Sequence, residues 1–311
     1  MLRIAVPDLI SNSYFPIIAA VEMGFFKQEG FDASVDLLFP IPKTFEALRD
    51  GQLDFVVGSA HATLLAFPEW RGAKLLASCG QHTYWFLVIR KDLNPRRGDL
   101  SVVKGLRIGA APGVDLSLQR MLVAAGIDTA KDNVQIMPIP GAAGGPNVSF
   151  GLSAAKALED GKLDGFWANG MGCEVALRHG VGTMVLDVRR GDGPPAARDY
   201  TFSALVTTEK LIKEQPAAAR AAVRALMRAH KALKEDANRA TEVGQKRFPP
   251  SEAELIAELV RRDLPYYDPN IPPEKVASMN RFAQDIGLLK APASYEEVVA
   301  TEFCSLWNEP I

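Results

Sequence analysis

The sequence lacks the features that mark several specialised classes of protein. Its three cysteines, Cys79, Cys173 and Cys304, are far apart and form no CxxC pair, which excludes a disulfide scaffold and the usual cysteine-based zinc site. One disulfide is compatible with this count, but three buried thiols are the simpler interpretation. No apolar run approaches the roughly 18–20 residues that a membrane-spanning helix needs.

The chain also lacks an excess of charge of either sign. Its 311 residues include 35 basic and 37 acidic side chains, which give a net charge of −2. This balance does not favour nucleic acid or an anionic membrane as a partner. A hydrophobic fraction of 48% and a charged fraction of 23% are ordinary globular values, and the length suits two domains.

The common catalytic and nucleotide-binding motifs are missing as well. There is no GxSxG, HExxH or paired-cysteine motif, and the loop GAAGGPN (141–147) has neither GxxxxGK[ST] nor the full GxGxxG spacing. No further histidine or carboxylate with ligand spacing accompanies His61 and His82, so no metal is predicted. We expect no cofactor.

No signal sequence precedes the first strand-like run. Met1 leads directly into LRIAV (2–6), with no charged segment, apolar segment or cleavage site. Two interpretations remain open at this point. The chain is either a mature periplasmic form, or a cytoplasmic protein if Met1 is the native N-terminus.

One eight-residue motif, the octet, occurs twice. ALRDGQLD (47–54) and ALEDGKLD (157–164) agree at six of eight positions. Asp-Gly ends a helix, because glycine tolerates the left-handed conformation after the last turn, and the following leucine enters a strand. Asp54 and Asp164 then lie at the start of a strand, away from the edge where ligands bind, which predicts structural roles for both.

The segments around the octet form two similar series of strands and helices. The first series places strands at 2–6, 33–38 and 53–59, and the second has strand-like runs in 105–110, 133–139 and 163–169. Helical patterns separate these strands, for example at 16–26 and within 105–127. Alternation of this kind predicts two α/β units, each with a parallel sheet and covering helices.

Two further apolar strands follow the two series. TYWFLVIRKDL (83–93) and YTFSALVTTEKL (200–211) both have an aromatic start, alternating apolar residues and a charged helical entry. We expect them to carry the chain between the two domains as a hinge. RRGDGPPAARD (189–199) is expected to be a surface loop. The segments 215–236, 251–264, 273–287 and 294–307 all have helical apolar spacing.

Four of these segments, in the same order, resemble one known family. They are AAVEMGFFKQEGFDASVDLL (19–38), EALRDGQLDFVVGS (46–59), VKGLRIGAAPGVDLSLQRMLVAAGI (103–127) and AKALEDGKLDGFWANG (155–170). The chain resembles the periplasmic substrate-binding proteins of ABC importers, in the group that handles nitrate, sulfonates, taurine and pyrimidine precursors of thiamine.

This resemblance implies a type II periplasmic-binding-protein fold, which is α/β with two lobes and a two-stranded hinge. Each lobe would have a mixed, mainly parallel sheet with covering helices. The implied division is 1–85 for the first part of lobe I, 86–202 for lobe II and 203–311 for the return to lobe I. The implied partners are a small-molecule ligand and the membrane permease of an importer, and the expected state is a monomer.

Ligands of open parallel sheets bind beyond the carboxyl ends of the strands. The loops expected there are 11–14, 40–43, 59–63, 111–117, 141–147 and 168–172, with the hinge entry 81–85 between the lobes. The predicted ligand-binding residues are Asn12, Ser13, Tyr14, Ser59, Ala60, His61, His82, Trp85, Gly113, Val114, Asp115, Asn147, Trp167 and Asn169.

These residues predict a small ring compound. Aromatic side chains supply flat walls and a few polar groups supply direction, and free backbone N–H groups are expected at the helix starts after Tyr14, Ser59 and Gly113. Lys43 is the only strongly basic side chain in these loops, which disfavours a dianion but permits a monoanion or a neutral heterocycle.

Structural alternatives stay open for several of these positions. His61 and His82 have the interpretation of hydrogen-bonded structural histidines, and Tyr14 that of a packing residue before a helix. Trp85 also fits the hinge core. Trp167 fits either the cleft or the core, with the cleft slightly favoured.

The expected function is capture of a small organic solute between two lobes that close by hinge motion. The alternative is an enzyme on the same scaffold, a decarboxylase, a dehydratase or a relative of the thiamine-pyrimidine synthases, acting on a small ring acid. The cysteine-rich CCCFC signature of that synthase group is absent from this sequence.

Overall fold

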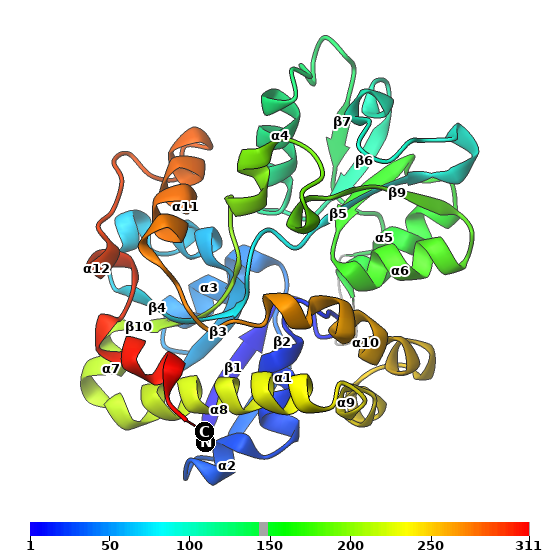
Figure 1. Cartoon of the computed structure of the whole chain (residues 1–311). Helices are drawn as coiled ribbons and strands as arrows, with labels where there is room; N and C mark the ends of the chain where they lie inside the picture. The colour runs from blue at the N-terminus through cyan, green and yellow to red at the C-terminus, as the bar shows by residue number, and fades with distance from the viewer. Residues whose placement is uncertain (143–148, 311) are drawn as a thin grey trace. The chain divides into compact units, whose positions relative to one another are not determined.

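The chain forms two compact units. The computed structural model describes residues 1–142 and 149–310. Unit 1 comprises Met1–His82 and Thr201–Ile311, and unit 2 comprises Thr83–Tyr200 (Figure 1). Each unit is built on one mixed sheet with helices around it, which confirms the predicted α/β fold class.

Unit 1 contains a sheet of five strands within its described residues, in the order β2–β1–β3–β10–β4. The strands are β1 (Leu2–Val6), β2 (Ala33–Leu37), β3 (Phe55–Ser59), β4 (Ala73–Gly80) and β10 (Ser203–Thr208). β1 pairs in parallel with β2 and β3, whereas β10 is antiparallel to both β3 and β4.

Unit 2 repeats this arrangement. Its described strands have the order β7–β6–β8–β5–β9. They are β5 (Phe86–Arg90), β6 (Arg107–Ala110), β7 (Gln135–Met137), β8 (Gly165–Ala168) and β9 (Gly182–Asp187). β6 pairs in parallel with β7 and β8, and β5 is antiparallel to β8 and β9. Strand by strand, β1, β2, β3, β10 and β4 therefore correspond to β6, β7, β8, β5 and β9.

The two segments expected to cross between domains supply the antiparallel strand of each sheet. β5 follows directly after the chain enters unit 2 at Thr83, and β10 follows its return to unit 1 at Thr201. β10 starts beside the end of β3 and β5 starts beside the end of β8, so each runs against the parallel strands of its sheet. The aromatic starts of both segments consequently lie at that edge.

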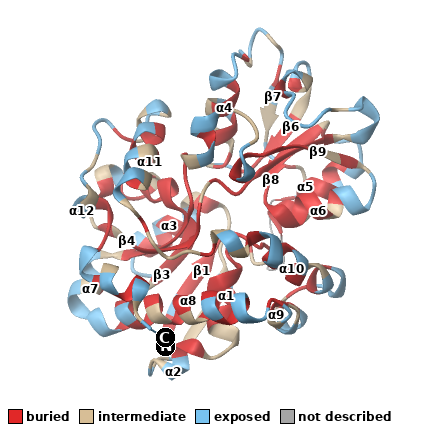
Figure 2. Cartoon of the chain, viewed as in Figure 1, coloured by how far each residue is buried: buried red, intermediate tan, exposed pale blue. Residues whose placement is uncertain are grey.

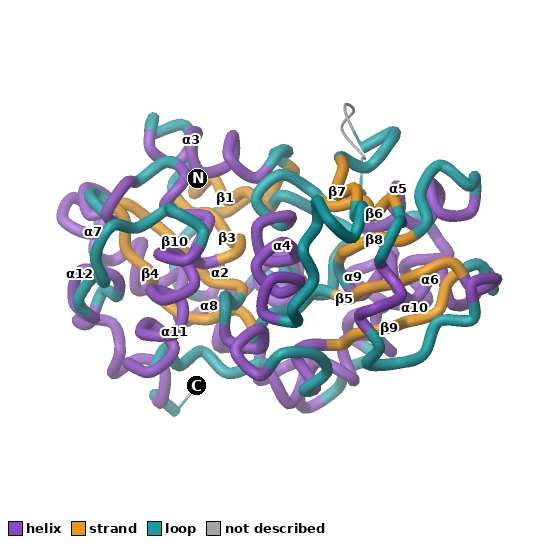
Figure 3. Tube along the Cα trace, turned by 90° about the horizontal axis from the view of Figure 1, so that it is seen from above, coloured by secondary structure: helices purple, strands orange, loops and turns teal. Residues whose placement is uncertain are grey.

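Helices cover both faces of the sheet in unit 1. Figure 3 shows α3 on one side of the strands and α8 on the other. The helices of unit 1 are α1 (Phe15–Glu22), α2 (Phe25–Gln28), α3 (Ile41–Arg49), α7 (Glu209–Glu214), α8 (Pro216–Glu235), α9 (Arg239–Arg247), α10 (Pro250–Asp263), α11 (Pro273–Asp285) and α12 (Tyr295–Val298). Short 3₁₀ helices are η1 (Ala60–Leu65), η2 (Pro68–Trp70), η7 (Leu264–Tyr266) and η8 (Thr301–Asn308).

Fewer helices cover the sheet of unit 2. They are α4 (Asp115–Ala124), α5 (Phe150–Glu159) and α6 (Gly170–Arg178), with 3₁₀ helices η3 (Lys91–Leu93), η4 (Leu100–Val103), η5 (Val188–Arg190) and η6 (Pro195–Asp199). α5 and α6 lie side by side (Figure 1). The two helices approach so closely that a Cβ atom added at Gly172 would lie 2.4 Å from the Gly151 carbonyl oxygen.

The core of each unit consists of its strands and the inner faces of its helices (Figure 2). α8 shows why the sequence folds this way. Val223, Leu226 and Leu233 recur at helical spacing and are fully buried, while the charged residues of the same helix face outward. Burying a side chain of this size contributes about 1.5–3 kcal/mol, so this face stabilises a helix that its propensity alone would leave marginal.

The repeated octet forms the same joint in both units. In unit 1, α3 ends at Arg49, and Gly51 adopts φ 73° before β3 begins. Arg3 of β1 closes this joint. Its Nε and Nη2 donate to the Asp54 carboxylate at 3.2 and 3.1 Å, its backbone N–H donates to the same group at 2.7 Å, and Nη2 also donates to the Gly51 carbonyl at 3.0 Å.

Unit 2 has an equivalent set of contacts. Arg107 of β6 donates to the Asp164 carboxylate through its backbone N–H at 3.0 Å, Nε at 2.9 Å and Nη2 at 2.9 Å, and to the Gly161 carbonyl at 3.1 Å. Arg90 of β5 adds an Nη1 contact to Asp164 at 3.4 Å. The structural roles predicted for Asp54 and Asp164 are confirmed. We call each set the arginine–aspartate clamp.

Several local expectations are wrong. The segment 294–307 is not one helix, since α12 ends at Val298, the next residue bridges to Leu75 of β4, and η8 follows. Lys43 lies on α3 and not in a loop. Arg189, in the expected surface loop 189–199, is only 2% exposed. β4 and β9 were not anticipated at all.

The clamp of unit 2 generates a stability prediction. The hydrogen bonds from Arg107 lower the pKa of the Asp164 carboxyl to about 2. Asp164→Asn should therefore lower the free energy of unfolding by about 1–3 kcal/mol at pH 7. Because the folded-state pKa is depressed, this stabilisation is complete above the ordinary pKa of 3.8 and is lost as the pH falls through about 2.

Urea unfolding of both proteins at pH 7, 5 and 3 measures this difference. The matched control is Asp160→Asn, because the ion pairs of Asp160 with Lys156 and Lys162 are solvent-exposed and contribute little to stability. Equal losses for the two variants, or a pH-independent difference for Asp164→Asn, would contradict the role of the clamp.

Candidate functional site

The register of the strands decides which residues gather at the carboxyl edge of each sheet. In unit 1 the loop after β1, the η1 segment after β3, the start of β10 and the end of β4 meet there. In unit 2 the segments after β6 and β8, the start of β5 and the end of β9 meet at the equivalent edge. Ligands of open α/β sheets bind at such edges.

The loop after β1 buries three of the predicted residues. Asn12 and Ser13 are each 2% exposed and Tyr14 is 4% exposed. Asn12 Nδ2 donates to Asp263 Oδ2 at 2.6 Å, and Tyr267 donates its hydroxyl to the Asn12 carbonyl at 3.3 Å. Tyr14 immediately precedes α1. Contacts to α10 and η7 thus hold this loop in place.

The segment after β3 is also buried. Ser59, Ala60, His61 and Thr63 are each at most 1% exposed. The expectation of free N–H groups here is wrong, because the Ala60 N–H donates to the Phe202 carbonyl at 2.9 Å and the His61 N–H to Thr201 Oγ1 at 3.5 Å. Residues 201–202, which lead into β10, satisfy these donors.

The two histidines lie in different surroundings. The ring of His61 is fully buried and packs edge-on against Phe282 of α11, with ring centroids 5.1 Å apart. His82 is half-buried at the end of unit 1's first segment, with a left-handed φ of 64°. Lys275 Nζ lies 2.8 Å from His82 Nδ1, so a lysine ammonium donates to this ring nitrogen. Ligand contact stays a prediction for both histidines.

An aromatic cluster occupies the edge of unit 2. The Trp85 ring lies 5.0 Å from Tyr84 and 6.1 Å from Trp167, measured between centroids. Trp167 is fully buried, and its Nε1 donates to Ser117 Oγ at 2.9 Å. Ser117 in turn donates to the Val114 carbonyl at 2.7 Å. The slight preference for an open cleft position of Trp167 finds no support in this environment, and its contact with a ligand stays a prediction.

Arg189 is the residue at this edge that the sequence patterns missed. It follows β9, is 2% exposed, and its guanidinium carbon lies 5.8 Å from the centre of the Tyr84 ring. The flanking Pro/Gly-rich loop concealed it. A signal did exist, because the apolar run MVL (184–186) leads towards this residue, but the strand that contains it, β9, was not recognised.

The backbone N–H groups in the turn after β6 find their acceptors within the same turn. Gly113, at φ 89°, donates its N–H to Asp115 Oδ1 at 2.8 Å, and the N–H groups of Val114 and Asp115 donate to the Ala111 carbonyl. Free N–H groups were expected here too, and that expectation is wrong. Burial raises the pKa of the half-buried Asp115 carboxyl.

Asn169 caps a helix. Its Oδ1 accepts from the Gly172 N–H at 3.1 Å at the start of α6 and packs against Gly151. This role accounts for its residue type without a ligand. Asn147, the remaining predicted residue, lies outside the described residues.

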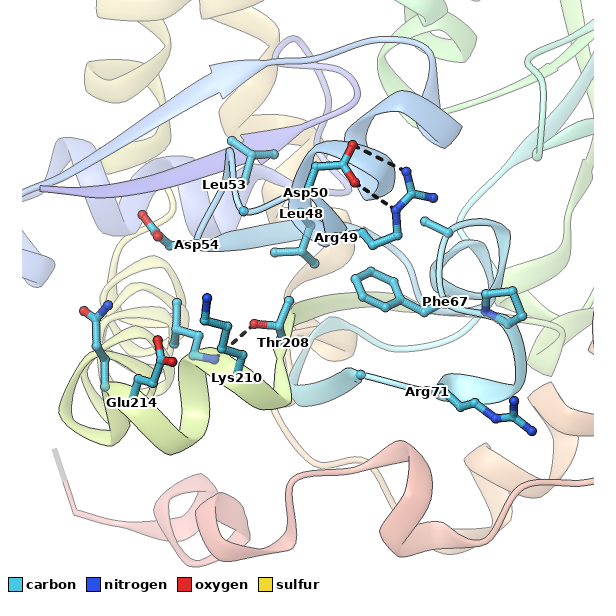
Figure 4. A pocket seen from close by; sticks show the side chains of 16 residues that line it. Leu48, Arg49, Asp50, Leu53, Asp54, Phe67, Arg71, Thr208, Lys210 and Glu214 are labelled. Carbon is cyan, nitrogen blue, oxygen red and sulfur yellow. Dashed lines mark hydrogen bonds and ion pairs between the residues drawn. The ribbon is translucent and has the colours of Figure 1, made fainter.

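A cavity of about 620 Å³ lies at the other end of unit 1's sheet (Figure 4). Octet residues line it, among them Asp50 and Asp54, together with Phe67 and Lys210. Figure 4 shows Arg49 and Asp50 paired at its wall. Of the predicted ligand residues that the structure describes, none lines this cavity.

Two searches of residues 1–142 and 149–310 have negative results. They contain no group of three or more His, Cys, Asp or Glu side chains that could hold a metal ion. Among the same residues, no helix combines the length and the apolar character needed to cross a membrane.

Comparison with known proteins places the chain in one group. Residues 11–240 match the family described as NMT1/THI5 like. Curated protein sequences include no significant match to the chain.

Solved structures share the fold at low sequence identity. A structure described as a putative periplasmic sulfonate-binding protein from Methylobacillus flagellatus has 18% sequence identity and a TM-score of 0.67, over 98% of this chain and 93% of that one. The periplasmic nitrate-binding protein of Synechocystis has 16% identity and a TM-score of 0.74, over 98% and 87% of the two chains. The desulfurization enzyme DszB has 14% identity and a TM-score of 0.65, over 99% of both.

The hydrogen bond of Trp167 provides a test of the edge of unit 2. Ser117→Ala should lower the free energy of unfolding by about 1–3 kcal/mol, because the buried indole N–H would lose its acceptor. Ser153→Ala, a half-buried serine on α5, is the matched control and should change little. Thermal and urea unfolding measure both variants, and equal small effects would show that the indole finds another acceptor.

Proposed function

The chain belongs to the NMT1/THI5-like family, and we propose that it is the solute-binding component of an ABC importer. Its ligand is a small organic compound, aromatic or heteroaromatic, and a carboxylate on it is compatible with the site. The proposal places the protein in the periplasm, as a monomer that delivers its ligand to a membrane permease. The periplasmic sulfonate- and nitrate-binding proteins of the same fold support this class of function.

One observation carries the proposal. Two units with the same strand order each gather buried polar and aromatic side chains at the carboxyl edge of the sheet. Unit 1 offers Asn12, Ser13 and Thr63, and unit 2 offers Trp85 and Trp167. A pocket with apolar ring walls and few polar groups suits a small ring compound better than a bare inorganic anion.

The proposed mechanism is a shift of population between open and closed forms. A ligand that contacts residues of both units binds the closed form better, and this difference in affinity drives closure. The two crossings, at His82–Thr83 and Tyr200–Thr201, are the segments that would bend. Their attachment to antiparallel strands within the sheets would confine bending to few residues.

A second candidate is an enzyme of the same fold, because the desulfurization enzyme DszB has this fold. The thiols of this chain do not favour cysteine chemistry. Cys79 and Cys173 are buried, and burial raises the pKa of the Cys304 thiol, which disfavours the reactive thiolate. Asp115, whose carboxyl pKa is raised by burial, is one candidate for proton transfer.

A thermal-shift screen tests the proposal directly. Nitrate, alkanesulfonates, aromatic acids and pyrimidines are compared at equal concentration. A true ligand at about 100 times its Kd stabilises the folded state by about 2.7 kcal/mol, so a clear rise in Tm is expected for one class. No stabilisation by any class would count against a solute-binding role. Mass spectrometry of the bound compound after incubation separates the candidates, since a binding protein returns it unchanged.

Substitution at the two edges tests which residues contact that ligand. Trp167→Ala and His61→Ala should each weaken binding by about 1–3 kcal/mol. Trp70→Ala is the control, because Trp70 is a buried aromatic residue of unit 1 outside the carboxyl edge. Isothermal titration gives the affinities. A lower Tm with unchanged affinity would assign the residue to the core alone.

A further inference from the structure

Three buried oxygen atoms at the carboxyl edge of unit 1 have no hydrogen-bond partner among the described residues. They are Asn12 Oδ1, Ser13 Oγ and Thr63 Oγ1. The first two belong to the loop after β1 and the third to η1 after β3, and β1 and β3 are neighbours in the sheet. Trp70 Nε1 of η2 and Asn280 Oδ1 of α11 are further atoms of this kind.

Leaving such atoms unpaired is costly. A buried polar group without a partner costs about 1–3 kcal/mol, and most native proteins pair nearly all of them. Three on adjacent segments at the edge where ligands bind indicate that a bound molecule supplies their partners. We call Asn12, Ser13 and Thr63 the oxygen triad.

The triad is suited to accept hydrogen bonds. Because Asn12 Nδ2 donates to Asp263 at 2.6 Å, the orientation of the amide is determined and Oδ1 is left as a pure acceptor. The hydroxyls of Ser13 and Thr63 can accept or donate. At least one donor on the ligand is therefore required, and up to three are accommodated.

The charges of unit 1 disfavour an anion at this place. Asp8, on the loop after β1, and Asp263, at the end of α10, are buried carboxylates. No lysine or arginine among the described residues of unit 1 is buried. Lys43 is exposed, and half-buried Lys275 donates to His82. The N–H groups of Ala60 and His61, which would suit an oxyanion, are already used by β10.

We propose that the ligand presents an N–H donor group, neutral or cationic, to the oxygen triad of unit 1. The inference rests on the proposed solute-binding function and narrows its substrate class to aminated ring compounds. Thr63, which was not among the residues predicted from the sequence, is a ligand-binding residue in this assignment. Nitrate and simple sulfonates are poor ligands, because they have no donor for the triad.

The first experiment compares matched ligands by isothermal titration. The pairs are 4-aminobenzoate with benzoate and 4-aminopyrimidine with pyrimidine, and nitrate and methanesulfonate form the anion arm. The amino member of a pair should bind at least about tenfold more tightly than its partner. Tighter binding of nitrate or methanesulfonate, or of the member without the amino group, would overturn the donor assignment, while the solute-binding function would stand.

The second experiment uses variants and does not depend on the ligand's identity. Thr63→Val removes only the unpaired hydroxyl, so the ligand-free Tm should stay equal or rise, while Thr63→Ser retains the hydroxyl. Ser13→Ala should behave like Thr63→Val. Both should weaken binding of the preferred amino compound about five- to tenfold, with Thr63→Ser much less affected.

The outcomes separate the two proposals. A drop in the ligand-free Tm for Thr63→Val that Thr63→Ser does not show would mean that the hydroxyl is paired within the protein, which overturns the inference. Unchanged affinity in Thr63→Val and Ser13→Ala overturns it as well. If no compound of either experiment or of the wider screen binds the unaltered protein, the proposed function fails and the inference fails with it.

Discussion

The arginine–aspartate clamp is the contact on which the geometry of both units depends. In each unit one arginine on the first parallel strand holds the carboxylate before the third strand and the carbonyl of the glycine that ends the intervening helix. Three elements are thereby joined at the amino edge of the sheet. Since side chains alternate along a strand, a register set at this edge decides which residues emerge at the opposite one.

The second constraint is that each sheet contains one antiparallel strand, which comes from the segment directly after a crossing between the units. The antiparallel strand of each sheet comes from the segment that has just crossed from the other unit, and it brings its aromatic or polar start to the carboxyl edge. In unit 1 the residues just before this strand, Thr201 and Phe202, also accept hydrogen bonds from the backbone donors after β3. The same topology therefore builds the candidate site and removes from it the groups that would hold an oxyanion.

The two edges differ in chemistry although their topology is the same. Unit 1 has buried carboxylates and the oxygen triad, whereas unit 2 has an aromatic cluster with a buried guanidinium, Arg189. This contrast arises because the clamps preserve the frame while the loops beyond the strands are free to diverge, as loops carry function on a rigid scaffold.

Much of the frame could be predicted from local patterns. The strands β1, β3, β6 and β8, and the helix ends before β3 and β8, were recognised because turn chemistry and apolar runs are local signals. β4 and β9 were missed; each is an edge strand whose single partner, β10 or β5, lies far away in the sequence. The segment 294–307 has helical spacing, yet its pairing with Leu75 interrupts the helix. Tertiary contact overrode propensity there.

The candidate site was predictable in position but not in chemistry. Strand ends locate Asn12, Ser59 and Trp167, because the carboxyl edge follows from strand order alone. Which atoms are already paired depends on distant partners, such as Asp263 for Asn12, Phe202 for Ala60 and Ser117 for Trp167. The sequence by itself determined two duplicated α/β units and the edge where each would bind, since these rest on periodicity and helix stops. Only the tertiary structure decided which polar atoms at that edge are left for a ligand, because long-range hydrogen bonds make that choice.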